Sequence, residues 1–237
     1  MNTSIDFNWK LALFSGFFFI LFVNLGLWQL ERATAKEDLI TEEATRRNLP
    51  PVLFNELPKD ARHLSGTVVR LKGEYAPDRI FLLDNRVLKG KVGFEVLVPY
   101  RESSGVLALV NRGFVPMGRT REETPVIPSL ITGEIADGSL YIAVENSFLL
   151  KEETIEVAHW PRIVQTSDPL VLQRLIGEDL YPHLFRLAES DPNALPRFWP
   201  TTIMLPVKHK GYALQWFTMA LVIAIAFTFF TFRKNDD

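Results

Sequence analysis

Two uncharged apolar runs, one near each end of the chain, restrict the possible folds more than any other sequence feature. Residues 11–30 and residues 211–232 contain no Asp, Glu, Lys or Arg. Each run has the length of a helix that crosses a bilayer core. Lipid offers no hydrogen-bond partners to backbone N–H and C=O groups, so a segment that spans it must be helical. We therefore predict a transmembrane helix at 11–30, an extramembrane domain at 31–210, and a second transmembrane helix at 211–232.

The first run also admits a secretory signal peptide. Lys10 precedes it, and Ala33-Thr34-Ala35 resembles a small-residue cleavage site. The apolar stretch exceeds the usual length of about 7–15 residues, and Glu31 and Arg32 interrupt it before that site, which favours an uncleaved anchor. Two spans place both termini on one side of the membrane and the domain on the other, but the flanking charges do not indicate which side.

The end of the first span and the beginning of the second both meet the domain, so their polar residues should lie at similar depths. Amide side chains inside lipid need partners, and small residues allow helices to approach closely. We expect Gln29 to contact Gln215 or Asn24, and Gly26 to pack near Ala213.

The sequence between the spans predicts a β-rich domain. Residues 31–48 are expected to continue the first helix as a charged stalk, which Pro50 and Pro51 end. From Gly66 onward, apolar and polar residues alternate. The expected fold class is a membrane protein of α+β type, with a mainly antiparallel sheet or barrel and minor helices. The predicted strands are 67–75, 80–83, 94–99, 106–111, 131–136 and 140–144, with hairpin turns at Gly105 and at Asp137-Gly138 and a short helix at 169–176.

Composition and motifs exclude several functions. The net charge of -2 provides no basic field for nucleic acid, and the absence of cysteine excludes disulfides and thiolate metal sites. The nucleotide-binding, nucleophile-elbow and zinc-protease motifs do not occur, and the four histidines are scattered. These features favour a chain that is not an enzyme.

Three segments together resemble the surfeit locus protein 1 family, membrane factors for assembly of cytochrome c oxidase. The segments are LGLWQL at 25–30, LDNR at 83–86 with VNRGFVP at 110–116, and HKGYALQWF at 209–217. Phe114 stands where the family usually has Trp, and Val207-Lys208 replaces a common pair of asparagines.

The resemblance implies a function, partners and a location. It implies that the protein receives haem a, with haem A synthase as a candidate donor, and aids haem insertion into the oxidase core subunit. It also implies a bacterial-type cell inner membrane or a mitochondrial inner membrane, with the domain facing the periplasm or intermembrane space. The bacterial membrane is favoured because we see no transit peptide.

The family's haem-linked positions correspond to His209 and Trp216. Spacings of 3 and 7 residues place His209, Tyr212 and Trp216 on one helical face. An imidazole nitrogen can bind haem iron, and Lys208 or Lys210 can meet haem carboxylates. In the alternative interpretation, His209 is an interfacial residue, the lysines are membrane anchors, and Trp216 only packs the helices.

The two Asn-Arg pairs, Asn85-Arg86 and Asn111-Arg112, also have two interpretations. They can form a recognition surface or a carboxylate contact. We favour a structural role, in which the Asn-Arg-Gly sequence at 111–113 ends a strand and Arg112 pairs with an acid of the domain.

Two other functions remain open. One is a membrane-anchored scaffold that binds proteins without haem. The other is a membrane-tethered enzyme whose site is assembled within the β-domain. A deep domain pocket with convergent acids or histidines would favour the enzyme.

Overall fold

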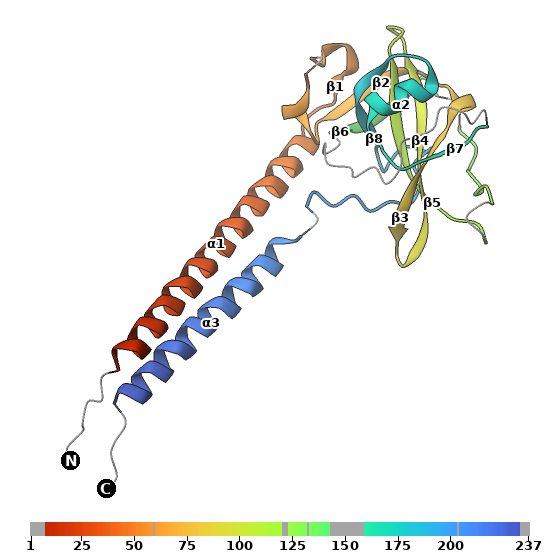
Figure 1. The fold of residues 1–237 in the computed structure, drawn as a ribbon. Helices are drawn as coiled ribbons and strands as arrows, with labels where there is room; N and C mark the ends of the chain where they lie inside the picture. Colours follow the sequence, from red (N-terminus) through yellow and green to blue (C-terminus); the bar gives the residue numbers. More distant parts are fainter. Residues whose placement is uncertain are drawn as a thin grey trace. The chain divides into compact units, whose positions relative to one another are not determined.

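A computed structural model describes residues 8–58, 60–119, 123–131, 133–142, 159–202 and 204–232. The chain divides into two compact units. One contains the residues up to Glu42 together with those from Pro200 onward, and the other runs from Glu43 to Trp199. Figure 1 shows the elements of both units, with α1 and α3 at the two ends of the colour scale.

The terminal unit is built from two long helices. Helix α1 spans Trp9–Arg47, and helix α3 spans Pro206–Thr231. Both are long and apolar enough to cross a membrane. Helix α1 continues from its apolar half through Ala33 and the charged segment to Arg47 without a break. Helix α3 begins at Pro206, where the missing N–H of proline costs no helical hydrogen bond.

Small residues line the contact between these helices. Gly26 and Ala33 of α1 and Ala213 and Ala220 of α3 are buried, whereas most neighbouring apolar side chains are exposed. A Cβ atom on Gly26 would lie 2.5 Å from the ring of Phe217. The predicted close approach at Gly26 is therefore present, and the ring of Phe217 packs directly onto the glycine backbone.

The second unit is an eight-stranded mixed sheet that closes on itself. Strands β2, β6, β8, β5 and β4 pair in that order, and a further pairing of β2 with β4 completes a ring. Strand β1 extends β2, and β3 and β7 extend β4. The strands are β1 (Val52–Leu53), β2 (Val68–Tyr75), β3 (Phe81–Leu88), β4 (Lys91–Glu102), β5 (Leu107–Pro116), β6 (Ile135–Tyr141), β7 (Arg162–Val164) and β8 (Leu180–Leu187).

One helix and three short 3-10 turns complete the domain. Helix α2 spans Pro169–Ile176, as predicted, and the turns span Phe54–Glu56, Arg62–Leu64 and Pro77–Arg79. The buried side chains form three clusters, of which the largest contains Leu71, Tyr100 and Phe185. The predicted α+β class, with long apolar helices flanking a mainly antiparallel β-domain, is confirmed.

The predicted hairpin of strands 131–136 and 140–144 is wrong, because a single strand, β6, replaces it. Asp137-Gly138 does not form a hairpin turn, because both residues lie inside the continuous strand β6 and pair with Val69 and Arg70 of β2. Strand β8 passes through Pro182. The predicted hairpin at Gly105 is confirmed between β4 and β5. Residues 143–144 of the last predicted strand lie outside the described residues.

Candidate functional site

A histidine of α3 contacts a glutamine of α1. His209 lies in the first turn of α3, is partly buried, and places its Nδ1 atom 2.8 Å from Oε1 of Gln29. The amide oxygen of Gln29 can only accept a hydrogen bond, so the proton of the neutral imidazole must lie on Nδ1. In this tautomer the Nε2 atom carries a lone pair, and neutral imidazole with such a lone pair is the form of histidine that binds metals. The contact therefore fixes the orientation and the tautomer of the imidazole.

Trp216 lies about two turns further along α3. Its ring stacks on Phe22 of α1, with ring centroids 5.6 Å apart and an interplanar angle of 30°. Phe22 in turn contacts Phe18, at 5.8 Å between centroids, and Phe18 contacts Phe14 at 4.7 Å. Trp216 therefore ends a column of aromatic rings that runs along the helix pair.

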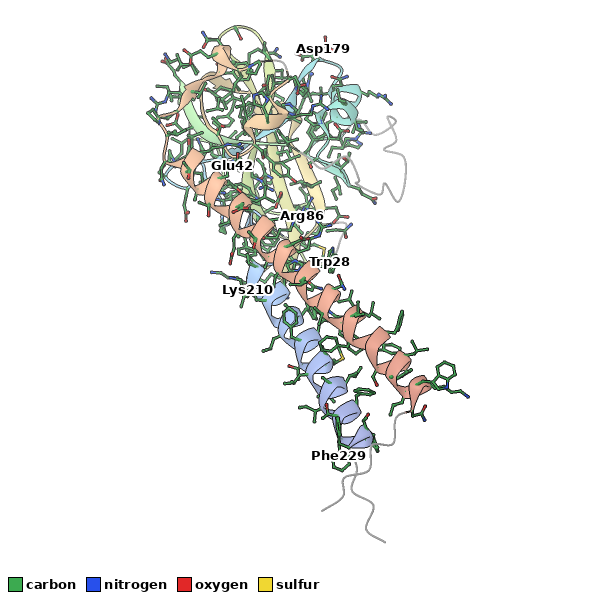
Figure 2. The ribbon with its side chains drawn as sticks, turned by 90° about the vertical axis from the view of Figure 1, so that its left-hand side faces the viewer. Trp28, Glu42, Arg86, Asp179, Lys210 and Phe229 are labelled. Atoms are coloured by element: carbon green, nitrogen blue, oxygen red, sulfur yellow. The ribbon has the colours of Figure 1, made fainter. Side chains whose placement is uncertain are left out.

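The remaining predicted residues occupy different environments. Lys210 donates to Glu37 of α1 at 2.6 Å, so its ammonium group already has an anionic partner. Lys208 is exposed, and Tyr212 is 45% exposed. Figure 2 shows Lys210 near the first turn of α3 and Phe229 near the opposite end of that helix. In the structure His209 thus contacts Gln29 and Trp216 contacts Phe22, whereas Tyr212 and Lys208 are exposed.

Gln29 is the residue whose role sequence reasoning missed. We expected it to contact Gln215 or Asn24, but its acceptor is directed to His209. Asn24 donates instead to the carbonyl of Ile20 in its own helix, at 2.7 Å. The position of Gln29 near the end of the first span predicts an amide that needs a partner, but it does not indicate that the partner is His209.

Both Asn-Arg pairs lie at β-bulges against β4. Leu83 pairs with Glu95 and Arg86 pairs with Gly93, so β3 carries one extra residue. Asn85 adopts a φ of 58° in that bulge, and its backbone N–H donates to the Asp84 carboxylate at 2.7 Å. A bulge changes the direction of the following side chain, in this case that of Arg86.

The second pair corrects our expectation of a strand end. Strand β5 continues through Asn111 and Arg112 to Pro116, and Arg112 is its extra residue opposite β4. Arg112 is 1% exposed, and burial lowers the pKa of its guanidinium. It donates to the carbonyls of Asn193 and Pro128, at 2.9 and 3.0 Å, rather than to an acid.

The β-domain also contains an open groove of about 1460 Å³. Two of its charged side chains, Glu102 and Arg112, have structural partners. The Glu102 carboxylate accepts from the Ser103 hydroxyl and the Ser104 N–H, and Arg112 bonds the carbonyls described above. No histidine is among the lining residues, and the described part of the chain holds no group of three His, Asp or Glu side chains placed to bind a metal.

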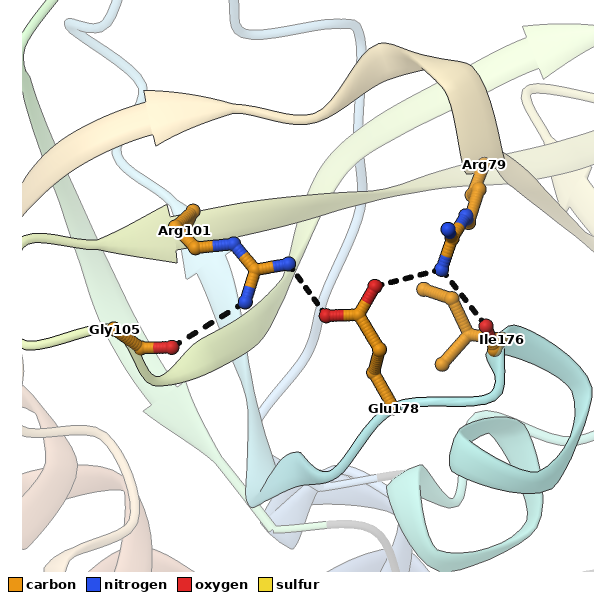
Figure 3. Close-up of polar contacts among 5 residues, drawn as sticks. All are labelled: Arg79, Arg101, Gly105, Ile176 and Glu178. Atoms are coloured by element: carbon orange, nitrogen blue, oxygen red, sulfur yellow. Dashed lines mark hydrogen bonds and ion pairs between the residues drawn. The ribbon is translucent and has the colours of Figure 1, made fainter.

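A surface ion-pair network lies elsewhere on the domain. Glu178 accepts from Arg79 at 2.8 Å and from Arg101 at 2.5 Å (Figure 3). Arg79 also donates to the Ile176 carbonyl and Arg101 to the Gly105 carbonyl. Hydrogen bonds from Arg101, and then the charge of Arg79, lower the pKa of Glu178. This network fixes the end of α2 to the strands.

These features define a class of protein in which a closed β-domain is flanked by two apolar helices that pair at a polar site. The SURF1 family model matches residues 16–221, and the chain therefore belongs to the SURF1 family. The resemblance found in the sequence is confirmed.

Relatives of this family match most of the chain. A SURF1-like protein of Monosiga brevicollis is 30% identical over 229 residues, which cover 90% of this chain and 84% of that protein. Surfeit locus protein 1 of Mus musculus is 26% identical over 212 residues, covering 82% and 67%. An uncharacterized SURF1-like protein of Mycobacterium tuberculosis is 26% identical over 237 residues, covering 92% and 80%.

Proposed function

We propose that this protein is a non-enzymatic assembly factor for cytochrome c oxidase, and that it binds haem a between its two terminal helices. In this proposal both helices span the membrane. The haem is held transiently and then passed to the oxidase core subunit, with haem A synthase as the candidate donor. The observation that carries the proposal is the 2.8 Å contact between Nδ1 of His209 and Oε1 of Gln29.

The donor set fits a haem iron. A ligating histidine usually donates its second ring nitrogen to an acceptor, which fixes the tautomer and raises the basicity of the ligand. Gln29 supplies that acceptor, and it belongs to the other helix. His209 would hold the haem iron through its Nε2 atom.

The surroundings also suit a large apolar ring with a polar edge. The stack of Trp216 on Phe22 offers aromatic surface on the lipid side of His209. On the domain side, Lys208 is exposed and can meet a carboxylate. Lys210 is a weaker candidate because Glu37 already holds it, so a haem carboxylate would have to displace that partner.

The test is purification of the full chain in detergent after co-expression with the enzymes that make haem a. We expect an absorption spectrum of bound haem a, and loss of that spectrum in His209→Ala. His63→Ala is the matched control, because His63 is exposed in the β-domain. A native chain without haem a, or unchanged binding in His209→Ala, would contradict the site.

An assembly assay separates the haem carrier from a protein-binding scaffold. A variant with both His209→Ala and Trp216→Leu should no longer support assembly of the oxidase in cells that lack the native protein. Full assembly activity of this double variant would favour a scaffold that works without haem.

A further inference from the structure

Two arginines lie over one tryptophan on the β-domain, and the charge of a third arginine acts on one of them. The guanidinium carbon of Arg186 lies 3.6 Å from the centroid of the Tyr141 ring and 5.0 Å from that of Trp199. Arg197 lies over the same tryptophan, at 5.2 Å. Arg86 is the third member, and its charge opposes that of Arg186. The aromatic faces attract Arg186 and Arg197 by cation–π interaction without neutralising their charges.

Two of these guanidinium groups have an unmet hydrogen-bonding requirement. The Nε atoms of Arg86 and Arg186 are buried and have no hydrogen-bond partner among the described residues. Burial lowers the pKa of Arg186, which shows how poorly its charge is solvated. Buried donors and buried cations without partners are rare in folded proteins, because each costs desolvation free energy.

Acids near the arginines offset part of their charge but do not bond the two unpaired Nε atoms. Glu95 accepts from the Asn111 amide at 2.6 Å and from the Trp199 indole at 3.0 Å, so neutral donors occupy both of its oxygens. Glu43, which also attracts Arg186, forms its ion pair with Arg47. Glu189 and Asp191 attract Arg197. The Nε atoms of Arg86 and Arg186 nevertheless receive no hydrogen-bond acceptor from these acids.

A pocket of about 220 Å³ opens beside this cluster. Its wall combines charged and aromatic side chains, and we call it the arginine pocket. Its main lining residues are Arg86, Val87, Glu95, Phe114, Arg197 and Phe198. The volume suits a phosphate group with a short stem, and the guanidinium fork is the side chain best matched to phosphate geometry.

The rim of the arginine pocket is apolar and basic. Phe198 is 74% exposed and Val87 is 65% exposed. Lys89 and Gly90 form a two-residue turn between β3 and β4, with φ values of 49° and 78°, and both Lys89 and Lys91 are exposed there. Exposed apolar side chains beside lysines are typical of surfaces that enter the headgroup region of an anionic membrane.

Chain length restricts how far this surface can be from the second span. Six residues, 200–205, separate Trp199 from Pro206 at the start of α3. A fully extended chain of that length covers no more than about 25 Å. Phe198 and Arg197 directly precede this short connection, which limits their distance from the start of α3.

We propose that the arginine pocket binds the phosphate group of an anionic membrane lipid, with Val87 and Phe198 entering the headgroup region. The proposal rests on the membrane-spanning helices of the proposed function, and it does not depend on haem. Lys89 and Lys91 add long-range attraction to the anionic surface, and Arg86 supplies the unpaired donor that the phosphate would satisfy.

The full chain contains no cysteine, so one introduced cysteine can carry a single environment-sensitive fluorophore. We would label Val87→Cys and reconstitute the protein into vesicles of phosphatidylcholine alone or with phosphatidylglycerol. Lipids with a nitroxide on the headgroup then report proximity by quenching. Ser104→Cys is the control in the turn at the other end of β4, and Phe229→Cys, within α3, verifies insertion.

We expect the Val87 label to be quenched and blue-shifted in the anionic vesicles, and the Ser104 label to remain in water. Removing Lys89 or Lys91 by substitution with Gln should lower the equilibrium constant for docking about fivefold per lysine. Arg86→Gln should also reduce quenching. Arg174→Gln, which removes an exposed charge on α2, should not reduce it.

Three results would overturn the lipid site. The first is a Val87 label that stays in water in both vesicles while the Phe229 label is inserted. The second is quenching that Arg86→Gln leaves unchanged in a protein with a native unfolding temperature. The third uses inorganic phosphate as the probe in detergent: an increase in unfolding temperature that requires Arg86, without lipid quenching, would assign the pocket to a free phosphate.

Discussion

His209 and Gln29 are 180 positions apart in the sequence, yet the Nδ1 atom of one lies 2.8 Å from the Oε1 atom of the other. The contact joins the first helix of the chain to the last. Neither helix alone supplies both the candidate ligand and the group that orients it. A site of this kind requires the two helices to pair before it can act.

Gln29→Leu should weaken haem a retention while leaving His209 in place. The substitution removes the acceptor that holds Nδ1–H, and loss of such a partner typically reduces metal affinity about tenfold to a hundredfold. The measurement is the amount of haem a that co-purifies, together with the position of the Soret band. Gln215→Leu changes an exposed amide of α3 and serves as the control. Equal loss in both variants would indicate a general effect on the helices.

Gly26→Leu should destabilise the helix pair, because the Cβ position already lies 2.5 Å from the Phe217 ring. Overpacking of this kind costs about 1–3 kcal/mol. The matched substitution is Gly16→Leu in the same helix, where no atom lies within 4 Å of the Cβ position. Unfolding of the detergent-solubilised chain should distinguish the two. Similar midpoints would show that Gly26 does not set the helix contact.

Arg112→Ala should lower the free energy of unfolding of the β-domain by about 3 kcal/mol, because it removes two hydrogen bonds from a charged donor. The carbonyls of Asn193 and Pro128 would lose their buried partner. Arg174→Ala is the control, since Arg174 is exposed on α2. Thermal unfolding of the full chain in detergent is the measurement. A midpoint that stays at the native value would mean that these carbonyls find other donors.

Glu178→Gln should reduce stability at pH 7 and have less effect in acid. The folded-state pKa of Glu178 lies below its ordinary value, so the stabilisation is present above the unfolded pKa of about 4.3 and disappears as the pH falls through the folded pKa. The residue is partly exposed, which limits the expected loss to about 0.5–1 kcal/mol. Unfolding midpoints of both proteins at pH 7 and pH 3 test this. A gap that widens in acid would contradict the assignment.

Local signals in the sequence were sufficient to predict the helices. In α2, Asp168 caps the N-terminus by accepting from the Leu170 N–H, Pro169 occupies the first turn, and Gly177 ends the helix in a left-handed conformation. Each of these signals acts within a few residues of the helix end, so a single sequence contains them. The two terminal helices were evident for a similar reason, since lipid-spanning length is a local property.

The strand errors arose where tertiary contacts override local preference. Asp137-Gly138 has the composition of a turn, but the Asp137 carboxylate accepts two hydrogen bonds from Arg70, both at 2.7 Å, across the sheet. A Cβ atom on Gly138 would lie 2.9 Å from the Arg186 carbonyl, so glycine is needed there for close approach of β8. Neither partner is close in sequence, and local pattern therefore predicted the wrong element.

The candidate site was predictable on one helix only. The spacing of His209, Tyr212 and Trp216 follows from helical geometry, and Tyr212 nevertheless remains exposed while Trp216 packs on Phe22. The partner of His209 depends on how α1 and α3 are aligned along each other. The alignment depends on the packing of the Phe217 ring against Gly26. The spacing of residues in the sequence does not predict this packing.

The pairing of β2 with β4 has a consequence for association between molecules. A closed ring of strands leaves few free backbone donors and acceptors. Among the described strands the open edges are the two-residue β1, the three-residue β7 and the part of β3 beyond Leu83, which β7 does not cover. Long exposed edges are templates for strand exchange and aggregation. Proteins held in a membrane meet one another at high local concentration, and this domain offers its neighbours only short edges on which to add a strand.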